Sequence, residues 1–422
     1  MAETRIRSRL LRRRWGYEVR LQLLAILACW VLTSWLGRDT GEFVFSLAIL
    51  LGVCVSPKLR TEVPTRLLHR QRLRRTQKRL DLALGADSPV MVERALSSVG
   101  ETITCSLLLG SSVPAITKAA PVIATAFGAR EVRVRPKPES AGLVELVVVW
   151  HESLEEPVPP NMLWAKPTDV YGHLPLGIDE DGEEVVIGLV GRHLLIGGET
   201  GAGKSGTLSV VLAGAALDPS CDIWCFDGKQ VELAAWEPVA RRVIGPDMEE
   251  ANDALDELRA EMDERYAGLK AEGRRKVEKG DGTRPIIVVI DELAFYVSNG
   301  DKKAAQGFSE KLRDLVARAR AAGIAVVAAT QKPSADLIPT ALRDNFGYRL
   351  AHRCATRDAS DTILGSGWAT EGISASSIDP RLRGVGYLLA EGGVPRRMRA
   401  VYLDDEEIAT VVSYAELERR NR

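Results

Sequence analysis

The stretch LLIGGETGAGKSGT, from Leu194 to Thr207, places five glycines around a single lysine. Residues 198–205 within it fit the spacing G-x-x-x-x-G-K-[ST], in which glycine backbone N–H groups turn inward around phosphate oxygens. The apolar run at 193–196 predicts a buried strand, and the segment after Lys204 predicts a helix whose N-terminus faces the anion. The sequence therefore predicts a phosphate-binding loop between a strand and a helix, as in an α/β fold.

The residues of this loop have separate predicted roles. We expect Lys204 to reach the β- and γ-phosphates of a nucleotide and the Ser205 hydroxyl to bind Mg²⁺. We expect the rest of the loop to line the phosphates through its backbone. The predicted cofactor-binding residues are Gly198, Glu199, Thr200, Gly201, Ala202, Gly203, Lys204, Ser205 and Gly206.

Two later apolar runs end in the polar side chains that a hydrolytic site needs. RPIIVVIDELAFYV runs into Asp291 and Glu292, and GIAVVAAT runs into Gln331. A carboxylate at the carboxyl end of a buried parallel strand lies beside the phosphate loop, so we expect Asp291 to hold Mg²⁺ and Glu292 to polarise the attacking water. Gln331 is placed to sense the γ-phosphate. Lys204, Asp291, Glu292 and Gln331 are therefore the predicted catalytic residues of a nucleoside triphosphatase.

Length and composition set wide limits on the remaining interpretation. The 422 residues allow two or three domains, and 56 basic against 57 acidic side chains neither favour nor exclude a nucleic-acid partner. The six cysteines and five histidines follow no redox or metal-ligand spacing. We interpret them as structural residues of a chain with reduced cysteines.

The first eighty residues differ in composition from the rest. Two apolar runs, at 21–37 and 43–55, would be about 26 and about 20 Å long as helices, which is marginal for a bilayer. Arginine and lysine cluster outside both runs, while the connector RDTGE is short and nearly neutral. The distribution predicts a transmembrane helical hairpin over 21–57, with a basic N-terminus at 1–20 and a basic juxtamembrane segment at 58–80 both in the cytoplasm.

Other interpretations of this region are weaker. A cleaved signal peptide would lack the second apolar run that follows here, and the first run has no clear A-x-A site. The basic tracts suit anionic lipid better than they suit direct DNA contact. The predicted location is therefore the cytoplasmic membrane.

Residues 81–160 predict a small α/β domain. ETITCSLLL, EVRVRP and LVELVVVW have the pattern of strands, and AITKAAPVIATAFGA that of a helix ending near Gly128. PLGIDEDGEEVVIGL then predicts a hairpin that turns at Asp181–Gly182. We assign 161–405 to the nucleotide-binding domain and 406–422 to a C-terminal helix.

Taken together, these motifs resemble the FtsK/SpoIIIE/TraB family of membrane-anchored, double-stranded DNA translocases. The resemblance covers roughly 101–403, and AAGIAVVAATQKPSADLIP is its most specific part. The matching stretches are LPLGIDEDGEEVV, HLLIGGETGAGKSGT, CFDGKQVELAAWE, EMDERY, IIVVIDELAFYV, ARAAGIAVVAATQKPSADLIPTALRDNF and SDTILGSG.

The resemblance implies a RecA-like P-loop NTPase core that assembles as a homo-hexameric ring around duplex DNA. ATP and Mg²⁺ would bind between subunits, and an arginine of the neighbouring subunit would stabilise the γ-phosphate in the transition state. The candidates for that arginine are Arg318, Arg320, Arg343, Arg349 and Arg353.

A ring motor that moves over any sequence should contact DNA phosphates rather than bases. The candidate contact segments are 273–282 and 298–303. The short tail leaves no room for a sequence-reading winged helix, so the chain is more similar to compact actinobacterial proteins of conjugative transfer. The expected function is a membrane-tethered DNA translocase that moves plasmid or integrated-element DNA between cells. Chromosome segregation at the septum and an ATPase energising protein secretion are the alternatives.

Overall fold

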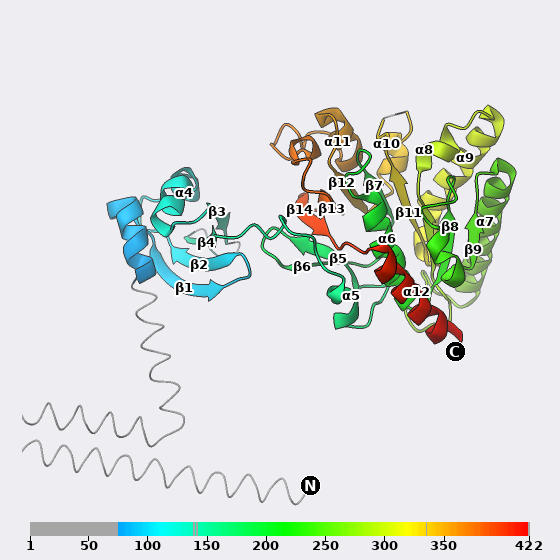
Figure 1. The fold of residues 1–422 in the computed structure, drawn as a ribbon, viewed down its shortest axis with the longest axis horizontal. Helices are drawn as coiled ribbons and strands as arrows, with labels where there is room; N and C mark the ends of the chain where they lie inside the picture. Colours follow the sequence, from blue (N-terminus) through cyan, green and yellow to red (C-terminus); the bar gives the residue numbers. More distant parts are fainter. Residues whose placement is uncertain (1–74, 138–139, 141, 335, 421–422) are drawn as a thin grey trace, which may run out of the picture. The chain divides into compact units, whose positions relative to one another are not determined.

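A computed structural model describes residues 75–137, 140, 142–334 and 336–420. They form two compact units, one made of the chain up to Leu96 with Glu101–Val149, the other of Ser97–Gly100 with the chain from Trp150 onward (Figure 1). The predicted membrane hairpin at 21–57 lies outside the described residues. Within those ranges, no helix is both long and apolar enough to cross a bilayer.

The first unit is a helix on a four-stranded sheet of order β1-β2-β4-β3. Helix α4 starts after the N-cap Ser112 and ends at Gly128, whose φ of 60° suits a left-handed C-cap. The predicted helix end near Gly128 is therefore confirmed, whereas the edge strand β1 was not predicted. The elements are β1 (Val90–Leu96), β2 (Gly100–Ser106), α4 (Val113–Phe127), β3 (Glu131–Pro136) and β4 (Leu143–Val149), after a helix over 75–84 and a 3₁₀ turn, η1 (Gly85–Asp87).

The second unit is built on a ten-stranded sheet of order β6-β5-β14-β13-β12-β7-β11-β10-β8-β9. Neighbouring strands in the half that runs from β12 through β7, β11, β10 and β8 to β9 pair in parallel. Neighbouring strands in the other half, from β12 through β13, β14 and β5 to β6, pair antiparallel. The strands are β5 (Leu174–Asp179), β6 (Glu184–Ile187), β7 (Leu194–Gly197), β8 (Asp222–Phe226), β9 (Arg242–Ile244), β10 (Ile286–Ile290), β11 (Ile324–Thr330), β12 (Tyr348–His352), β13 (Val385–Ala390) and β14 (Arg396–Ala400).

Helices cover both faces of this sheet (Figure 1). Helices α6 and α12 belong to the apolar cluster on one face, and α7 and α9 to the cluster on the other. The helices are α5 (Asn161–Ala165), α6 (Lys204–Leu217), α7 (Met248–Ala271), α8 (Leu293–Val297), α9 (Lys302–Arg318), α10 (Thr340–Arg343), α11 (Arg357–Leu364) and α12 (Asp405–Arg420), with 3₁₀ turns η2 (Ala234–Val239), η3 (Ala319–Ala322) and η4 (Ala375–Ser377).

The central parallel strands are apolar at nearly every position because both of their faces are buried. In β10, Ile287 and Val289 join the cluster around α6, while Ile286, Val288 and Ile290 join the cluster around α7 and α9. A strand of this kind has no interior position where a polar side chain could meet solvent. Polar groups are therefore confined to the strand ends, where the candidate site lies.

The predicted hairpin and C-terminal helix are both present in the second unit. Strands β5 and β6 pair antiparallel, and Gly182 in their connection has a φ of 74°. Helix α12 packs against α6, and the guanidinium of Arg419 donates to the carbonyl oxygens of Ala215 and Asp218 at 3.0 and 3.2 Å. These bonds satisfy carbonyls that the end of α6 leaves free.

Two histidines are fully buried in the second unit. The Nε2–H of His193 donates to the Val316 carbonyl, and its Nδ1 accepts from the Val326 N–H, both at 2.9 Å. His352 donates from Nδ1 to the Val385 carbonyl at 3.0 Å and accepts the Thr207 hydroxyl at Nε2 at 2.8 Å. Burial lowers the pKa of His193 to about 3 and that of His352 to about 4, so both rings are neutral when folded.

We predict that His352 makes the fold sensitive to acid. Its folded pKa lies below the unfolded value, so its contribution to stability is complete above about pH 6.5 and is lost as pH falls towards 4. This residue should lower the free energy of unfolding by roughly 2 kcal/mol between pH 7.5 and 5. Thermal unfolding of His352→Asn should show a smaller pH dependence than the unaltered chain, and the same exchange at the exposed His151 is the matched control. Equal pH dependence in all three would contradict the prediction.

Candidate active site

The loop between β7 and α6 has the backbone shape of a phosphate cradle. Gly203 has a φ of 119° and is the N-cap of α6, so the free N–H groups of the helix start within the loop. A Cβ at Gly203 would lie 2.6 Å from the backbone of Gly384, whose N–H donates to the Ala202 carbonyl at 2.9 Å. The turn before β13 therefore packs closely against this loop and is hydrogen-bonded to it.

Lys204 folds back over this loop. Its ammonium donates to the carbonyl oxygens of Gly198 and Glu199 at 2.8 and 2.7 Å. Burial lowers its pKa to about 8, against the opposing effect of the Glu292 and Asp291 carboxylates. A phosphate in the loop would offer this ammonium a stronger, charged acceptor than two neutral carbonyls.

Asp291 follows β10 and is only 6% exposed. Its Oδ2 is buried without a hydrogen-bond partner among the described residues, and the nearest cation is the Lys229 ammonium at 3.6 Å. Burial raises the pKa of Asp291 to about 6. A buried oxygen with unused acceptor capacity is a suitable ligand for a hard cation, so Asp291 fits Mg²⁺, together with the exposed hydroxyl of Ser205 at the start of α6.

Glu292 is the N-cap of α8 and is tied to the end of β11. Its carboxylate accepts the Thr330 hydroxyl at 2.9 Å, the Ala294 N–H at 3.2 Å and the Gln331 N–H at 3.1 Å. These bonds orient the carboxylate relative to two neighbouring strand ends. A general base for a water molecule needs this kind of fixed orientation.

Gln331 connects the end of β11 to the phosphate loop directly. Its Oε1 accepts the Thr200 hydroxyl at 2.7 Å. The contact follows from strand order, because β11 lies between β7 and β10 in the sheet. The four predicted catalytic residues and the loop are therefore placed at one edge of the sheet, as the sequence pattern indicated.

Sequence reasoning missed one group at this edge and considered another only for the site of a neighbouring subunit. Lys229, in the turn after β8, forms the ion pair with Asp291. Arg353, after β12, forms an ion pair with Glu199 of the loop. Position relative to a strand end was the available signal for both. Lys229 is the third residue after β8, and Arg353 directly follows β12.

The arginines considered for a neighbouring subunit all have carboxylate partners in their own chain. Arg353 contacts the loop of its own chain, which places it in that chain's nucleotide site. Which arginine would act on a neighbour stays a prediction. The ion pairs are Arg318 with Asp263 and Asp314, Arg320 with Glu391, Arg343 and Arg349 with Asp344, and Arg353 with Glu199.

The segment 273–282, one of the two predicted DNA-contact segments, is anchored at several points. Arg274 forms an ion pair with Asp281, Val277 is buried, and the Val277 N–H donates to the Ala321 carbonyl at 2.8 Å. The segment precedes β10, so it lies at the sheet edge opposite the phosphate loop.

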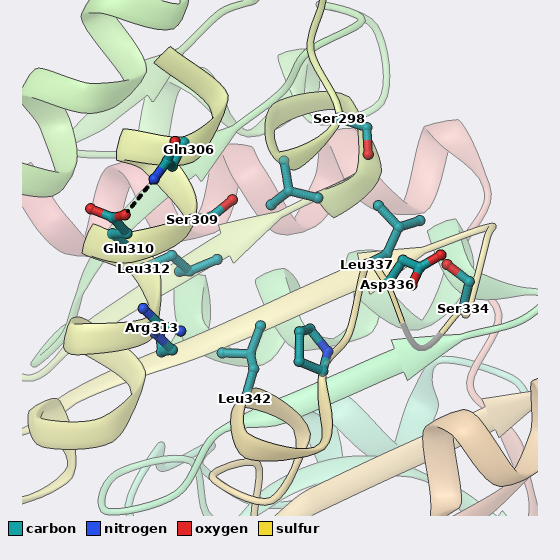
Figure 2. Close-up of a pocket in the computed structure, with 12 residues that line it drawn as sticks. Ser298, Gln306, Ser309, Glu310, Leu312, Arg313, Ser334, Asp336, Leu337 and Leu342 are labelled. Atoms are coloured by element: carbon teal, nitrogen blue, oxygen red, sulfur yellow. Dashed lines mark hydrogen bonds between the residues drawn. The ribbon is translucent and has the colours of Figure 1, made fainter. Parts of the chain in front are cut away.

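The segment 298–303 joins α8 to α9 on the catalytic edge. Its first residue, Ser298, lines a cavity of about 520 Å³ between α9 and the chain beyond β11 (Figure 2). Gln306 and Glu310 of α9 are hydrogen-bonded to each other on its wall at 3.0 Å. Of the two predicted DNA-contact segments, this one is therefore on the same edge as the catalytic residues.

We predict that Gly203→Ala weakens nucleotide binding far more than Gly206→Ala does. The first Cβ would meet the Gly384 backbone at 2.6 Å in a left-handed conformation, whereas the second would have nothing within 4 Å. Titration with a fluorescent ATP analogue should show at least about a tenfold weaker affinity for Gly203→Ala, because the loop must shift to relieve the contact. Equal affinities for the two variants would contradict this view of the loop.

The part of the chain that carries this site is similar to known proteins. Residues 160–363 match the model of the FtsK/SpoIIIE family. DNA translocase FtsK of Halalkalibacterium halodurans is 28% identical over 337 residues, covering 72% of this chain and 40% of that protein. DNA translocase FtsK of Corynebacterium glutamicum is 30% identical over 253 residues, covering 54% of this chain and 26% of that protein. The chain thus spans less than half the length of these relatives.

Solved structures share the fold. The pCW3 conjugation coupling protein TcpA, in its monomer form with ATPgS, superposes with a TM-score of 0.54 at 21% identity, covering 82% of this chain and 99% of that one. ATPases 2 and 3 of EssC from Geobacillus thermodenitrificans superpose with a TM-score of 0.51 at 16% identity, covering 63% and 51%. Residues 160–363 therefore form a domain of the FtsK/SpoIIIE family, and that domain is a P-loop ATPase.

Proposed function

We propose that this chain is an ATP-hydrolysing, double-stranded DNA translocase that works as a hexamer tethered to the cytoplasmic membrane by a hairpin at 21–57. One observation carries the proposal. The phosphate loop, the unpartnered Asp291 oxygen and the oriented Glu292 carboxylate lie at one edge of an FtsK/SpoIIIE-family domain. Relatives named DNA translocase support duplex DNA as the substrate.

The hydrolytic cycle follows from the contacts of the site. ATP binding brings its phosphates to the N-terminus of α6, and Lys204 exchanges the carbonyls of Gly198 and Glu199 for phosphate oxygens. Asp291 and Ser205 would hold Mg²⁺, which would supply charge neutralisation for the phosphates. Glu292 then polarises the attacking water on the far side of the γ-phosphate.

Gln331 is the group that can report the γ-phosphate to the rest of the domain. In the nucleotide-free site its side chain accepts the Thr200 hydroxyl, and its N–H donates to Glu292. A γ-phosphate beside Thr200 would offer a competing acceptor for that hydroxyl. Loss of the bond would release the chain beyond β11, which lines the same cavity as Ser298 of the proposed DNA-contact segment (Figure 2).

The proposed cellular role is transfer of plasmid or integrated-element DNA between cells. The fold shared with a conjugation coupling protein over most of both chains favours this role. Chromosome segregation is the alternative within DNA transport. Protein secretion, the other alternative that the sequence left open, lies outside DNA transport.

We predict that Glu292→Gln binds ATP but hydrolyses it about 10²- to 10⁴-fold more slowly, because the amide cannot accept a proton. Nucleotide titration and phosphate release measured on the same preparation would check this. The matched control is Glu310→Gln, which changes a carboxylate of α9 that is not part of the catalytic constellation. Unchanged hydrolysis in Glu292→Gln would exclude this residue as the general base.

We also predict that duplex DNA of any sequence stimulates the ATPase. The DNA concentration for half-maximal stimulation should rise at least about tenfold between about 50 and about 200 mM salt, because phosphate contacts release counterions. Steady-state ATPase assays with two duplexes of unrelated sequence measure both properties. An ATPase indifferent to DNA would contradict the translocase and favour the secretion alternative.

A further inference from the structure

Lys229 is a cation beside the metal-binding carboxylate that no step of the hydrolytic cycle uses. Its ammonium lies 3.6 Å from Asp291 Oδ2, with side-chain exposures of 44% and 6% for the two residues. The distance is too long for a hydrogen bond, and that oxygen has no hydrogen-bond partner in the described chain. The contact is therefore electrostatic, between a half-exposed cation and a buried anion.

The turn that carries Lys229 is rigidly constructed. Asp227, 1% exposed at the end of β8, accepts the N–H groups of Lys229 and Gln230 at Oδ1, at 3.1 and 3.0 Å. Its Oδ2 accepts the Leu233 N–H at 2.8 Å. Three bonds to one buried carboxylate fix the backbone from Lys229 to Leu233.

The same turn packs closely against α8, the helix that follows Asp291. A Cβ at Gly228 would lie 2.5 Å from the ring of Phe295 in α8, so only glycine permits this approach. Gln230 has a φ of 58°, the positive-φ non-glycine position among the described residues. An uncommon backbone conformation of this kind persists where the surrounding structure holds it. Close packing and this conformation together fix the turn that carries Lys229 beside Asp291.

The negative charges around Asp291 make its carboxylate unfavourable unless a cation lies nearby when no metal is present. The carboxylates of Glu232, Asp227 and Glu292 all act unfavourably on its charge. Lys204 also interacts favourably with the Asp291 charge, but its ammonium donates to the loop carbonyls in the nucleotide-free site. A buried carboxylate without compensation is strongly destabilising, and Lys229 is the cation at ion-pair distance from it.

We propose that Lys229 is a positioning residue that takes the place of the metal ion in the nucleotide-free enzyme. Its ammonium holds the Asp291 carboxylate in the binding orientation and is displaced when Mg²⁺ arrives with ATP. The proposal rests on the Mg²⁺–ATP site of the proposed function. It implies that Lys229 and Mg²⁺ compete for one oxygen.

Thermal unfolding of the full chain in EDTA tests the compensation. Lys229→Met should lower the midpoint by about 3 °C, because the buried carboxylate loses its cation. In an Asp291→Asn background the same substitution should have no effect, since the amide carries no charge. Equal losses in both backgrounds would show that Lys229 contributes through packing alone and would overturn the proposal.

Metal titration tests the competition. With a saturating non-hydrolysable ATP analogue, the Mg²⁺ concentration for half-maximal stabilisation should be about five-fold lower for Lys229→Met than for the unaltered chain. Lys279→Met is the matched control, because it removes a lysine paired with Asp169 at 2.7 Å at the opposite sheet edge. It should leave the Mg²⁺ requirement unchanged. An unchanged or higher requirement in Lys229→Met would overturn the competition.

Different results would contradict the proposed Mg²⁺–ATP site and the proposed role of Lys229. If the site does not bind Mg²⁺ and ATP, the unaltered chain will show no stabilisation by the analogue with Mg²⁺. If only the role of Lys229 is wrong, the unaltered chain will be stabilised and Lys229→Met will respond to Mg²⁺ in the same concentration range.

Discussion

The burial of the central parallel strands on both faces is the constraint on which the rest of the ATPase domain depends. Strands β7, β8, β10 and β11 have apolar clusters above and below them, so charged groups can reach solvent only beyond the strand ends. Parallel pairing brings the carboxyl ends of these strands to one edge. The phosphate loop, Asp227, Asp291 and Gln331 are close together because each follows one of those strands.

A second consequence of burial is that the polar groups of the site must find partners when no nucleotide is bound. Lys204 donates to two loop carbonyls, Gln331 accepts from Thr200, and Asp291 is compensated by Lys229. The Lys204 contacts close the loop after β7, whereas the Thr200–Gln331 and Lys229–Asp291 contacts each join two different strand ends. Nucleotide binding would exchange several of them together, which gives a physical route from phosphate contacts to movement of the surrounding loops.

The predictions from sequence were most successful where a local pattern has one physical meaning. The glycine loop, the strand before it and the helix after Lys204 occur as predicted, because positive φ at Gly201 and Gly203 and the apolar run of β7 are local properties. Asp291 and Glu292 were found because they end a five-residue apolar strand. Strand β1 was missed, since a strand at a sheet edge with mostly exposed positions has little apolar contrast. The anchoring of 273–282 was missed because charged residues that pair with one another resemble a solvated loop in sequence.

By itself, the sequence determined the identity of the chemical groups: a phosphate loop, a lysine, two carboxylates and a glutamine, each at the end of a predicted element. The tertiary structure decided their partners. Placement of β11 between β7 and β10 brought Gln331 to Thr200, and the close approach of Gly228 to Phe295 brought Lys229 to Asp291. Such contacts join residues far apart in the chain, and their distances depend on strand order and packing, which no local pattern encodes.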